Sequence, residues 1–302
     1  MFGQKNDKTT KTTNKISDNK YNNISLTKRL EENITLLENI FSGDEMLVTR
    51  RFQNKHLIQA KCCILYIEGM VNSEIINENI IMPVLNNNLA EELNKTNLLE
   101  ELQHKVIASN KVIMTNDLNK IVRNITYGDT IFLLEGYDKV LVISSKGWQS
   151  RSISEPDSAR VIRGPREGFT ESIAVNLSLI RRKIKNPDLK FKFKELGERT
   201  RTVTCICYLE GLALESIINE LERRLDGMVI DSILDSGYIQ EYIKDEPFSP
   251  FETIGASERP DVIASKLLEG RVALFVDGSP FVLTVPFVLA EATQSNEDYY
   301  NN

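Results

Sequence analysis

The sequence predicts an α/β fold built from two similar tandem subdomains with small mixed sheets. The main observation is an internal repeat. Residues 63–78 (CILYIEGMVNSEIINE) recur 142 positions later as residues 205–220 (CICYLEGLALESIINE), with nine of sixteen letters identical. At the same offset, the apolar positions of residues 128–143 coincide with those of residues 270–285. A period this long indicates two globular units and not a solenoid, and 302 residues suffice for two cores.

The repeat also predicts the domain boundaries. Residues 1–24 are rich in Lys, Thr and Asn and nearly devoid of apolar side chains, so we expect a disordered tail. The first expected subdomain is 25–150 and the second is 151–302. A polar stretch at 147–156, which ends in Glu-Pro-Asp, is the expected linker region.

Each repeat is expected to begin with an amphipathic helix, because apolar residues recur there every three or four positions. These residues are Leu26, Leu30, Ile34, Leu37 and Phe41 in the first repeat and Ile173, Leu177 and Ile180 in the second. At an offset of 143, Thr27 aligns with Thr170 and Asn33 with Asn176. The two helices should therefore be equivalent.

Two strands and a helix follow in each repeat. Apolar runs predict strands at 47–52 and 61–67, with counterparts at 189–194 and 203–209. The second strand of each pair ends in Glu-Gly, where glycine permits the turn into a helix at 73–85 or 214–225.

A second helix and a hairpin complete each repeat. Thr115 and Ser257 are candidate N-caps, and Gly128 and Gly270 are candidate C-terminal stops of equivalent helices. The hairpins are expected at residues 130–134 with 139–144 and at 272–276 with 281–285. The predicted order is helix, strand, strand, helix, helix, hairpin, and the stretches before the second helices diverge most.

Composition excludes several classes of protein. A net charge of −6 disfavours nucleic acid as a partner, since phosphate binding requires clustered Lys and Arg. The four cysteines lie in two expected strands, Cys62 with Cys63 and Cys205 with Cys207, at spacings that neither disulfides nor metal sites favour. We expect buried free thiols, no metal and no cofactor.

The loop before the second repeat holds the first candidate contact residues. Arg163 and Arg166 lie in a Gly/Pro-constrained segment that runs into a helix start, so they could present donors to an anion or a carboxylate. Alternatively they pair with acids such as Glu167 or Glu171 and fasten the loop between the subdomains. The second interpretation is favoured, because such arginines more often tie surfaces together.

Arg259 and Asp261 form a second charged cluster at a helix start. Asp261 suits the first turn of the helix, and Arg259 could reach it or an outside carboxylate. A structural cap is the favoured interpretation. We carry both residues as candidates for ligand or subunit contact.

Enzyme motifs are absent, and we predict that the chain is not an enzyme. Nucleophile-elbow, Walker and Rossmann patterns are all missing. Glu68 and Glu210 could suggest paired acids, but they occupy the same position in separate repeats. Trp148 with Tyr137 could suggest an aromatic wall, although core or inter-lobe packing is the favoured role for the tryptophan.

Several segments resemble a known family. They are RGPREGFTES (163–172), NLSLIRRKI (176–184) followed by NPDLK (186–190), ERPDVIASKLLEGRVALFVDGSPFVLTVP (258–286) and EDYY (297–300). At these residues the chain is similar to the GerA family of spore germination proteins, and it looks like the soluble N-terminal region of a nutrient germinant receptor A subunit. The resemblance is strongest over 163–300, weaker over 26–144 and absent from the tail.

The resemblance implies a function and partners. Such A subunits act with a transporter-like B subunit and a lipoprotein C subunit in the inner spore membrane, where they sense amino acids, sugars, nucleosides or salts. It also implies two α/β subdomains similar to substrate-binding proteins, in a cytoplasm-facing region that would be soluble in isolation. We expect a sensing or coupling module whose lobes shift relative to one another. The alternatives are an assembly scaffold for the B and C subunits and, less favoured, an enzyme.

One departure from the family pattern concerns the end of the chain. Family members continue beyond the Asp-Tyr-Tyr segment into a membrane-spanning half, whereas this sequence ends at Asn302. We expect a truncated gene or a fragment.

Overall fold

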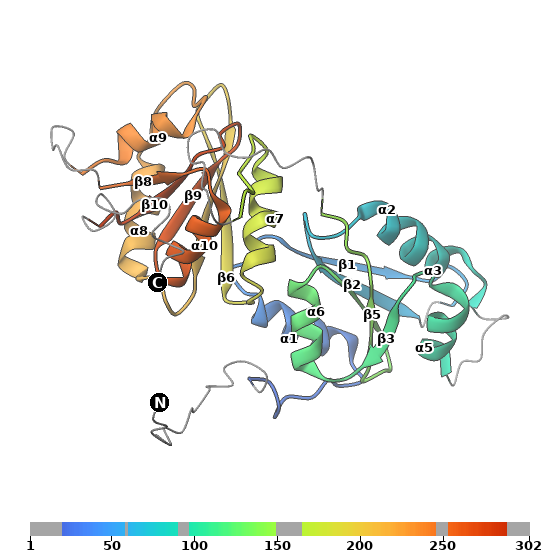
Figure 1. Ribbon diagram of the computed structural model, residues 1–302. Helices are drawn as coiled ribbons and strands as arrows, with labels where there is room; N and C mark the ends of the chain where they lie inside the picture. Colours follow the sequence, from blue (N-terminus) through green and yellow to red (C-terminus); the bar gives the residue numbers. More distant parts are fainter. Residues whose placement is uncertain (1–19, 58–59, 90–96, 149–164, 246–252, 289–302) are drawn as a thin grey trace, which may run out of the picture.

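The computed structural model describes residues 20–57, 60–89, 97–148, 165–245 and 253–288, which form two α/β lobes (Figure 1). The first lobe contains α1 (Leu30–Ile40), β1 (Leu47–Gln53), β2 (Lys61–Ile67), α2 (Ser73–Ile76), η1 (Asn77–Ile81), α3 (Met82–Asn86), α5 (Leu98–Glu101), η3 (Leu102–Val106), β3 (Val112–Thr115), α6 (Leu118–Thr126), β4 (Thr130–Leu134) and β5 (Val140–Ile143). The second contains α7 (Ile173–Lys183), β6 (Leu189–Leu196), β7 (Thr202–Leu209), α8 (Glu215–Asp226), α9 (Ser236–Ile243), β8 (Gly255–Ser257), α10 (Pro260–Leu268), β9 (Val272–Val276) and β10 (Val282–Val285).

The two sheets have the same topology. Their strand orders are β1-β2-β4-β5-β3 and β6-β7-β9-β10-β8. The registers agree at the offset of the repeat, since Cys63 pairs with Leu133 and Cys205 with Phe275. The prediction of two similar tandem α/β subdomains is confirmed.

Strand direction differs from the expectation of mixed sheets. Within the described residues, every strand pairing is antiparallel, from the β1–β2 hairpin to the edge pairs β3–β5 and β8–β10. Apolar runs predict that a segment is a strand, but they carry no information about its direction in the sheet.

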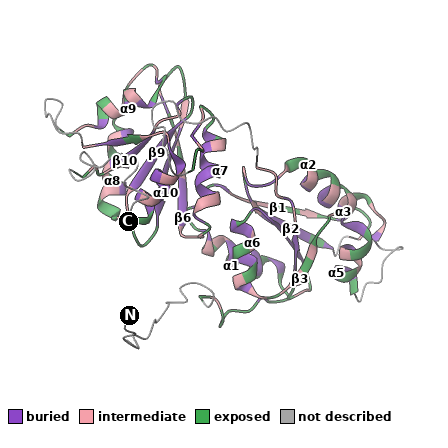
Figure 2. Cartoon of the chain, in the orientation of Figure 1, coloured by how far each residue is buried: buried purple, intermediate pink, exposed green. Residues whose placement is uncertain are grey.

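Helices cover both faces of each sheet, as Figure 2 shows by the buried strands between them. On β2, Cys63 and Leu65 face the core under α1 and α6, while Cys62 and Ile64 face the core under α2, α3 and α5. This alternation follows from the period of two along a strand. The second lobe repeats the arrangement, with α7 and α10 on one face and α8 and α9 on the other.

The start of the first helix in each lobe confirms the alignment of Thr27 with Thr170 and Asn33 with Asn176. Each threonine hydroxyl accepts the backbone N–H two residues ahead, at 3.2 and 3.3 Å. Each asparagine accepts the threonine N–H and donates to its carbonyl, at 2.8 and 2.7 Å in the first lobe and 2.8 and 2.6 Å in the second. Both asparagines are buried, so losing such a pair would cost about 1–3 kcal/mol.

The hairpin turns fasten these same helix starts. Glu135, which follows β4, accepts the N–H of Leu30 at 2.9 Å, and Asp277 accepts that of Ile173 at 3.1 Å. A carboxylate at this end of a helix also complements the helix dipole. The Asp-Gly turn therefore has a structural role in the second lobe.

The predicted N-caps were misplaced by two residues. Thr115 and Ser257 each accept the backbone N–H two positions ahead, at 3.1 and 3.2 Å, and the helices begin only beyond them. Asp117 caps α6, whereas Arg259 occupies the N-cap position of α10 without a side-chain capping bond. Serine and threonine favour such local turns as well as caps, which explains the error.

The predicted element order lacked one helix and one edge strand in each lobe. The helical stretch α5–η3 and strand β3 were missing from the first lobe, and α9 and β8 from the second. These elements lie where the repeats diverge, and β8 has only three residues. The predicted stops Gly128 and Gly270 are confirmed, with φ of +87° and +86°.

The domain boundaries stay predictions, because residues 1–19 and 149–164 lie outside the described ranges. At the end of the predicted tail, Lys20 forms an ion pair with Asp188 at 3.0 Å, and the Tyr21 N–H donates to Asn119 at 3.1 Å. No helix within the described residues is both long and apolar enough to cross a bilayer.

Candidate functional site between the two lobes

The two lobes share one apolar core. A single buried cluster includes Leu37 and Met46 of the first lobe together with Leu177 and Ile180 of the second. Lobes joined by a polar linker usually move, but an apolar contact opposes such motion. The expected shift of the lobes would have to disturb this cluster.

A loop of the first lobe docks against the edge of the second sheet. The Glu45 N–H donates to the carbonyl of Phe191 at 3.0 Å, and its carboxylate accepts the N–H of Phe193 at 2.9 Å. Both partners belong to β6, which is an edge strand. The contact satisfies backbone groups that would otherwise be open to another chain.

A buried ion pair joins the same loop to α7. Arg181 donates to the carboxylate of Asp44, and both side chains are fully inaccessible to solvent. The guanidinium also donates to the carbonyl of Asn186 at 3.1 Å and lies 4.7 Å from the centre of the Phe191 ring. Burial raises the pKa of Asp44, and the charge of Arg181 opposes the rise. Since guanidinium groups stay protonated in proteins, Arg181 keeps its charge in this buried position.

Lys190 adds a second buried cation beside this pair. Its side chain is 1% exposed, and its ammonium lies 3.4 Å from the carboxylate of Glu210, which is largely exposed. The ammonium has no hydrogen-bond partner among the described residues. Two cations and Asp44 are thus confined where the lobes meet, so this interface is electrostatically specific as well as apolar.

A cleft with a volume of about 800 Å³ opens between the lobes. Glu68, Asn72, Ser73 and Glu74 line it from the first lobe. The second lobe contributes the start of α7, at residues 172–175, together with Phe193. Its described lining contains two carboxylates and no basic side chain. The cleft therefore suits an uncharged or amine-bearing small molecule.

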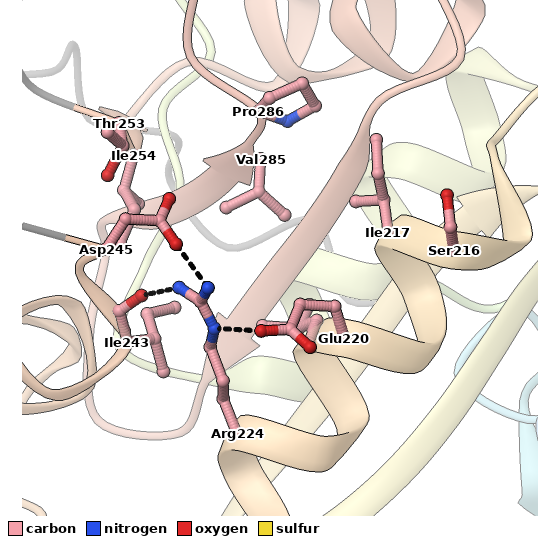
Figure 3. A pocket seen from close by; sticks show the side chains of 11 residues that line it. Ser216, Ile217, Glu220, Arg224, Ile243, Asp245, Thr253, Ile254, Val285 and Pro286 are labelled. Atoms are coloured by element: carbon pink, nitrogen blue, oxygen red, sulfur yellow. Dashed lines mark hydrogen bonds and ion pairs between the residues drawn. The ribbon is translucent and has the colours of Figure 1, made fainter.

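A smaller pocket of about 270 Å³ lies in the second lobe, between α8 and the end of β10 (Figure 3). Arg224 reaches across it, and its guanidinium bonds Glu220 at 2.7 Å as well as the carbonyl of Ile243 and the carboxylate of Asp245. The arginine is therefore satisfied by the protein itself. This arrangement favours a structural role for Arg224.

The predicted contact residues near the loop before α7 are dispersed. Arg163 lies outside the described residues. Arg166 is exposed, and Glu167 pairs with Arg182 at 3.3 Å and Lys183 at 3.1 Å. Glu171 is also exposed, and its carbonyl accepts the N–H of Gly278 at 2.8 Å.

Arg259 and Asp261 pair with each other at the start of α10. The guanidinium lies 2.6 Å from the carboxylate and is 1% exposed, which agrees with the favoured structural interpretation. Neither residue lines the inter-lobe cleft. Its lining also lacks Arg166, Glu167 and Glu171. A role of these residues in ligand or subunit contact stays a prediction.

The other residues singled out from the sequence have distinct positions. Trp148 contacts Tyr127 of the first lobe edge to face and lies 5.3 Å from the guanidinium of Arg182 in the second, so it packs between the lobes. Tyr137 is in a different core, where its hydroxyl accepts the N–H of Leu98 at 2.9 Å. The four cysteines are buried and free, as expected.

Fold and site together define a duplicated, two-lobed α/β module with a shared core and an inter-lobe cleft. The family model described as "Bacillus/Clostridium GerA spore germination protein" matches residues 35–302, and the chain belongs to this family. The expectation from the sequence motifs is confirmed.

Individual relatives agree with the family match. The chain is 36% identical to "Uncharacterized membrane protein YfkQ" and 34% identical to "Spore germination protein KA", both from Bacillus subtilis, over 98% and 92% of its length. It covers 56% and 51% of those proteins, and so spans about half of each. A crystal structure of the N-terminal domain of the A subunit of the Bacillus megaterium spore germinant receptor GerK3 matches with a TM-score of 0.70 and 33% identity, over 88% of this chain and 98% of that one.

Proposed function

We propose that this chain is the sensing and coupling region of a germinant receptor A subunit, which detects a nutrient and passes the signal to partner subunits. The partners would be a transporter-like B subunit and a lipoprotein C subunit at the inner spore membrane, with this region facing the cytoplasm. Family membership and the likeness to a receptor A-subunit domain support the assignment. The role is non-enzymatic.

The cleft between the lobes is the observation that carries the sensing role. A volume of about 800 Å³ lies within the range of small-molecule sites, about 300–1,000 Å³. Because its walls come from both lobes, a ligand there would contact both and would change the energy of their contact. Glu68 and Glu74 favour a ligand with an amino group, such as an amino acid.

Thermal shift with a panel of amino acids, sugars and nucleosides tests this role. At about a hundred times its dissociation constant, a ligand stabilises the fold by about 2.7 kcal/mol. Glu68→Gln should abolish the shift caused by an amine-bearing ligand, while Glu198→Gln, an exposed site on the second lobe, should leave it unchanged. A flat panel would contradict sensing in this cleft.

A second candidate function, an assembly scaffold without direct ligand binding, is favoured by exposed apolar residues on the second lobe. Leu212, Leu214 and Leu268 are 55%, 62% and 59% exposed. A Cβ at Gly270, two residues beyond Leu268, would meet the carbonyl of Leu212 at 2.7 Å, so the segment that holds Leu212 and Leu214 passes beside the end of α10. Clustered apolar surface of this kind is typical of protein contacts.

Co-purification with the B and C subunits tests the scaffold. Leu214→Glu combined with Leu268→Glu should release a partner without lowering the melting temperature. Met82→Glu, at a position 52% exposed on the first lobe, is the control. Retention of both partners by the double variant would rule out this surface.

A further inference from the structure

A basic pocket of about 420 Å³ lies at a second junction of the lobes, apart from the cleft. Lys111, Arg123 and Lys146 line it from the first lobe, and Lys185 lines it from the second. Asp129 is the one carboxylate in its described lining. Four cations around one carboxylate form a positive site in a chain whose net charge is −6.

Two of these cations converge on one ring. The ammonium groups of Lys146 and Lys185 lie 4.0 and 4.4 Å from the centre of the Tyr127 ring. Each gains a cation–π contact, but at an exposed ring that gain is small, about 0.5–1 kcal/mol. Like charges gathered around one ring repel each other, and a bound anion would reduce the repulsion.

Asp129 is the one acid in the described lining, and it attracts both Lys146 and Lys111. Lys146 lies 3.2 Å from Asp129, which is 6% exposed in its side chain. Within the part of the chain that the structure describes, no ion pair engages Lys111, Arg123 or Lys185. Asn124 also lines the pocket; one N–H of its amide donates to the carbonyl of Lys120 at 2.7 Å, and the amide carries a second N–H.

We propose that this pocket binds the phosphate group of a small phosphorylated molecule or of an anionic lipid headgroup. Lysine ammonium groups and a guanidinium are the usual partners of a phosphate, and the volume leaves room for the group that carries it. Because Lys185 lies two residues beyond the end of α7, in the second lobe, the anion would bridge the lobes. The inference does not depend on nutrient sensing in the cleft.

Calorimetric titration of the chain with inorganic phosphate and with glucose 6-phosphate tests the site at constant ionic strength, with glucose as the uncharged control. Both phosphates should bind saturably. Lys185→Gln and Arg123→Gln should each weaken binding about tenfold, because each removes one charged contact. Both side chains are exposed, so folding should be unaffected. The matched control is Lys139→Gln, an exposed lysine at the far end of the β4–β5 hairpin, which should change nothing.

Vesicle sedimentation distinguishes the two sources of phosphate. Vesicles of phosphatidylcholine containing phosphatidylglycerol should retain the wild-type chain, and lose the Lys185→Gln variant, if the source is a headgroup. Binding to glucose 6-phosphate without vesicle retention assigns a free phosphorylated molecule. The proposal is overturned by absence of binding in both arms, or by binding that Lys185→Gln and Arg123→Gln leave unchanged.

Discussion

The buried ion pair between the lobes gives the sharpest prediction. In Asp44→Asn, the shape of the side chain is kept, but Arg181 is left as a fully buried charge without its counter-ion. Removing one partner of a buried pair costs about 3–5 kcal/mol. For a chain of this size each kcal/mol shifts the melting temperature by roughly 2–4 °C, so the expected loss is on the order of 10 °C.

Double-mutant analysis separates the pair from its surroundings. We expect Arg181→Met alone to be strongly destabilising, and Asp44→Asn with Arg181→Met to recover a large part of the loss, because no unpaired charge remains. Urea unfolding followed by tryptophan fluorescence and circular dichroism measures all three variants. Trp148 lies between the lobes, so its fluorescence reports on the interface.

The control is a second, more exposed ion pair between the lobes. Lys20 and Asp188 lie 3.0 Å apart with side chains 55% and 32% exposed, so Lys20→Gln should cost less than about 1 kcal/mol. The reasoning would be refuted if Asp44→Asn were no more costly than Lys20→Gln, or if the effects at Asp44 and Arg181 were simply additive.

Three further predictions concern single positions. Burial lowers the pKa of Lys266 to about 8 in the folded protein, so between pH 8 and 10.5 only the unfolded state keeps the proton. The unfolding free energy of the wild type, measured relative to that of Lys266→Met, should therefore rise over this pH range. A difference that does not depend on pH would contradict this. Gly128→Ala should lower the free energy of unfolding by about 1–3 kcal/mol more than Gly136→Ala, as measured by thermal unfolding. Both glycines have φ near +90°, but of the two only a Cβ at Gly128 would meet backbone, the carbonyl of Met70 at 2.7 Å. Equal losses of stability would argue against this clash. Burial raises the pKa of the Cys62 and Cys63 thiols to about 12, so iodoacetamide at pH 8 should label them no faster than the protein unfolds. Rapid labelling of the folded protein would show that the thiols are accessible.

Duplication made much of the fold predictable from one sequence. Because two copies share a plan, weak patterns support each other: the strands ending in Glu68-Gly69 and Glu210-Gly211 were placed to within a residue or two. Strand β8 and helix α9 were missed, since neither has a counterpart with similar letters in the first repeat. Strand direction was also out of reach, because it depends on tertiary packing.

The candidate site was less predictable because its residues come from distant segments. Arg166 and Glu171 drew attention through local Gly and Pro chemistry, yet the cleft is formed by Glu68 and the start of α7. Contact between segments more than a hundred residues apart leaves no local pattern. The repeat correctly predicted that Glu68 and Glu210 occupy equivalent positions. It did not predict that their surroundings differ: Glu68 lines the cleft, whereas Glu210 lies beside Lys190.

The two copies differ in charge at two positions that lie at the contact between the lobes. Arg181 of α7 corresponds to Glu38 of α1, and Lys190 of β6 corresponds to Val48 of β1. The Glu38 side chain is 40% exposed, whereas Arg181 and Lys190 are buried against the other lobe. A buried cation is costly unless its surroundings compensate for it, and Asp44 of the first lobe attracts both of these cations. At Arg181 and Lys190 the difference between the copies coincides with the contact between the lobes, whereas Arg224, which corresponds to Met82 of the first repeat, bonds only groups of its own lobe among the described residues.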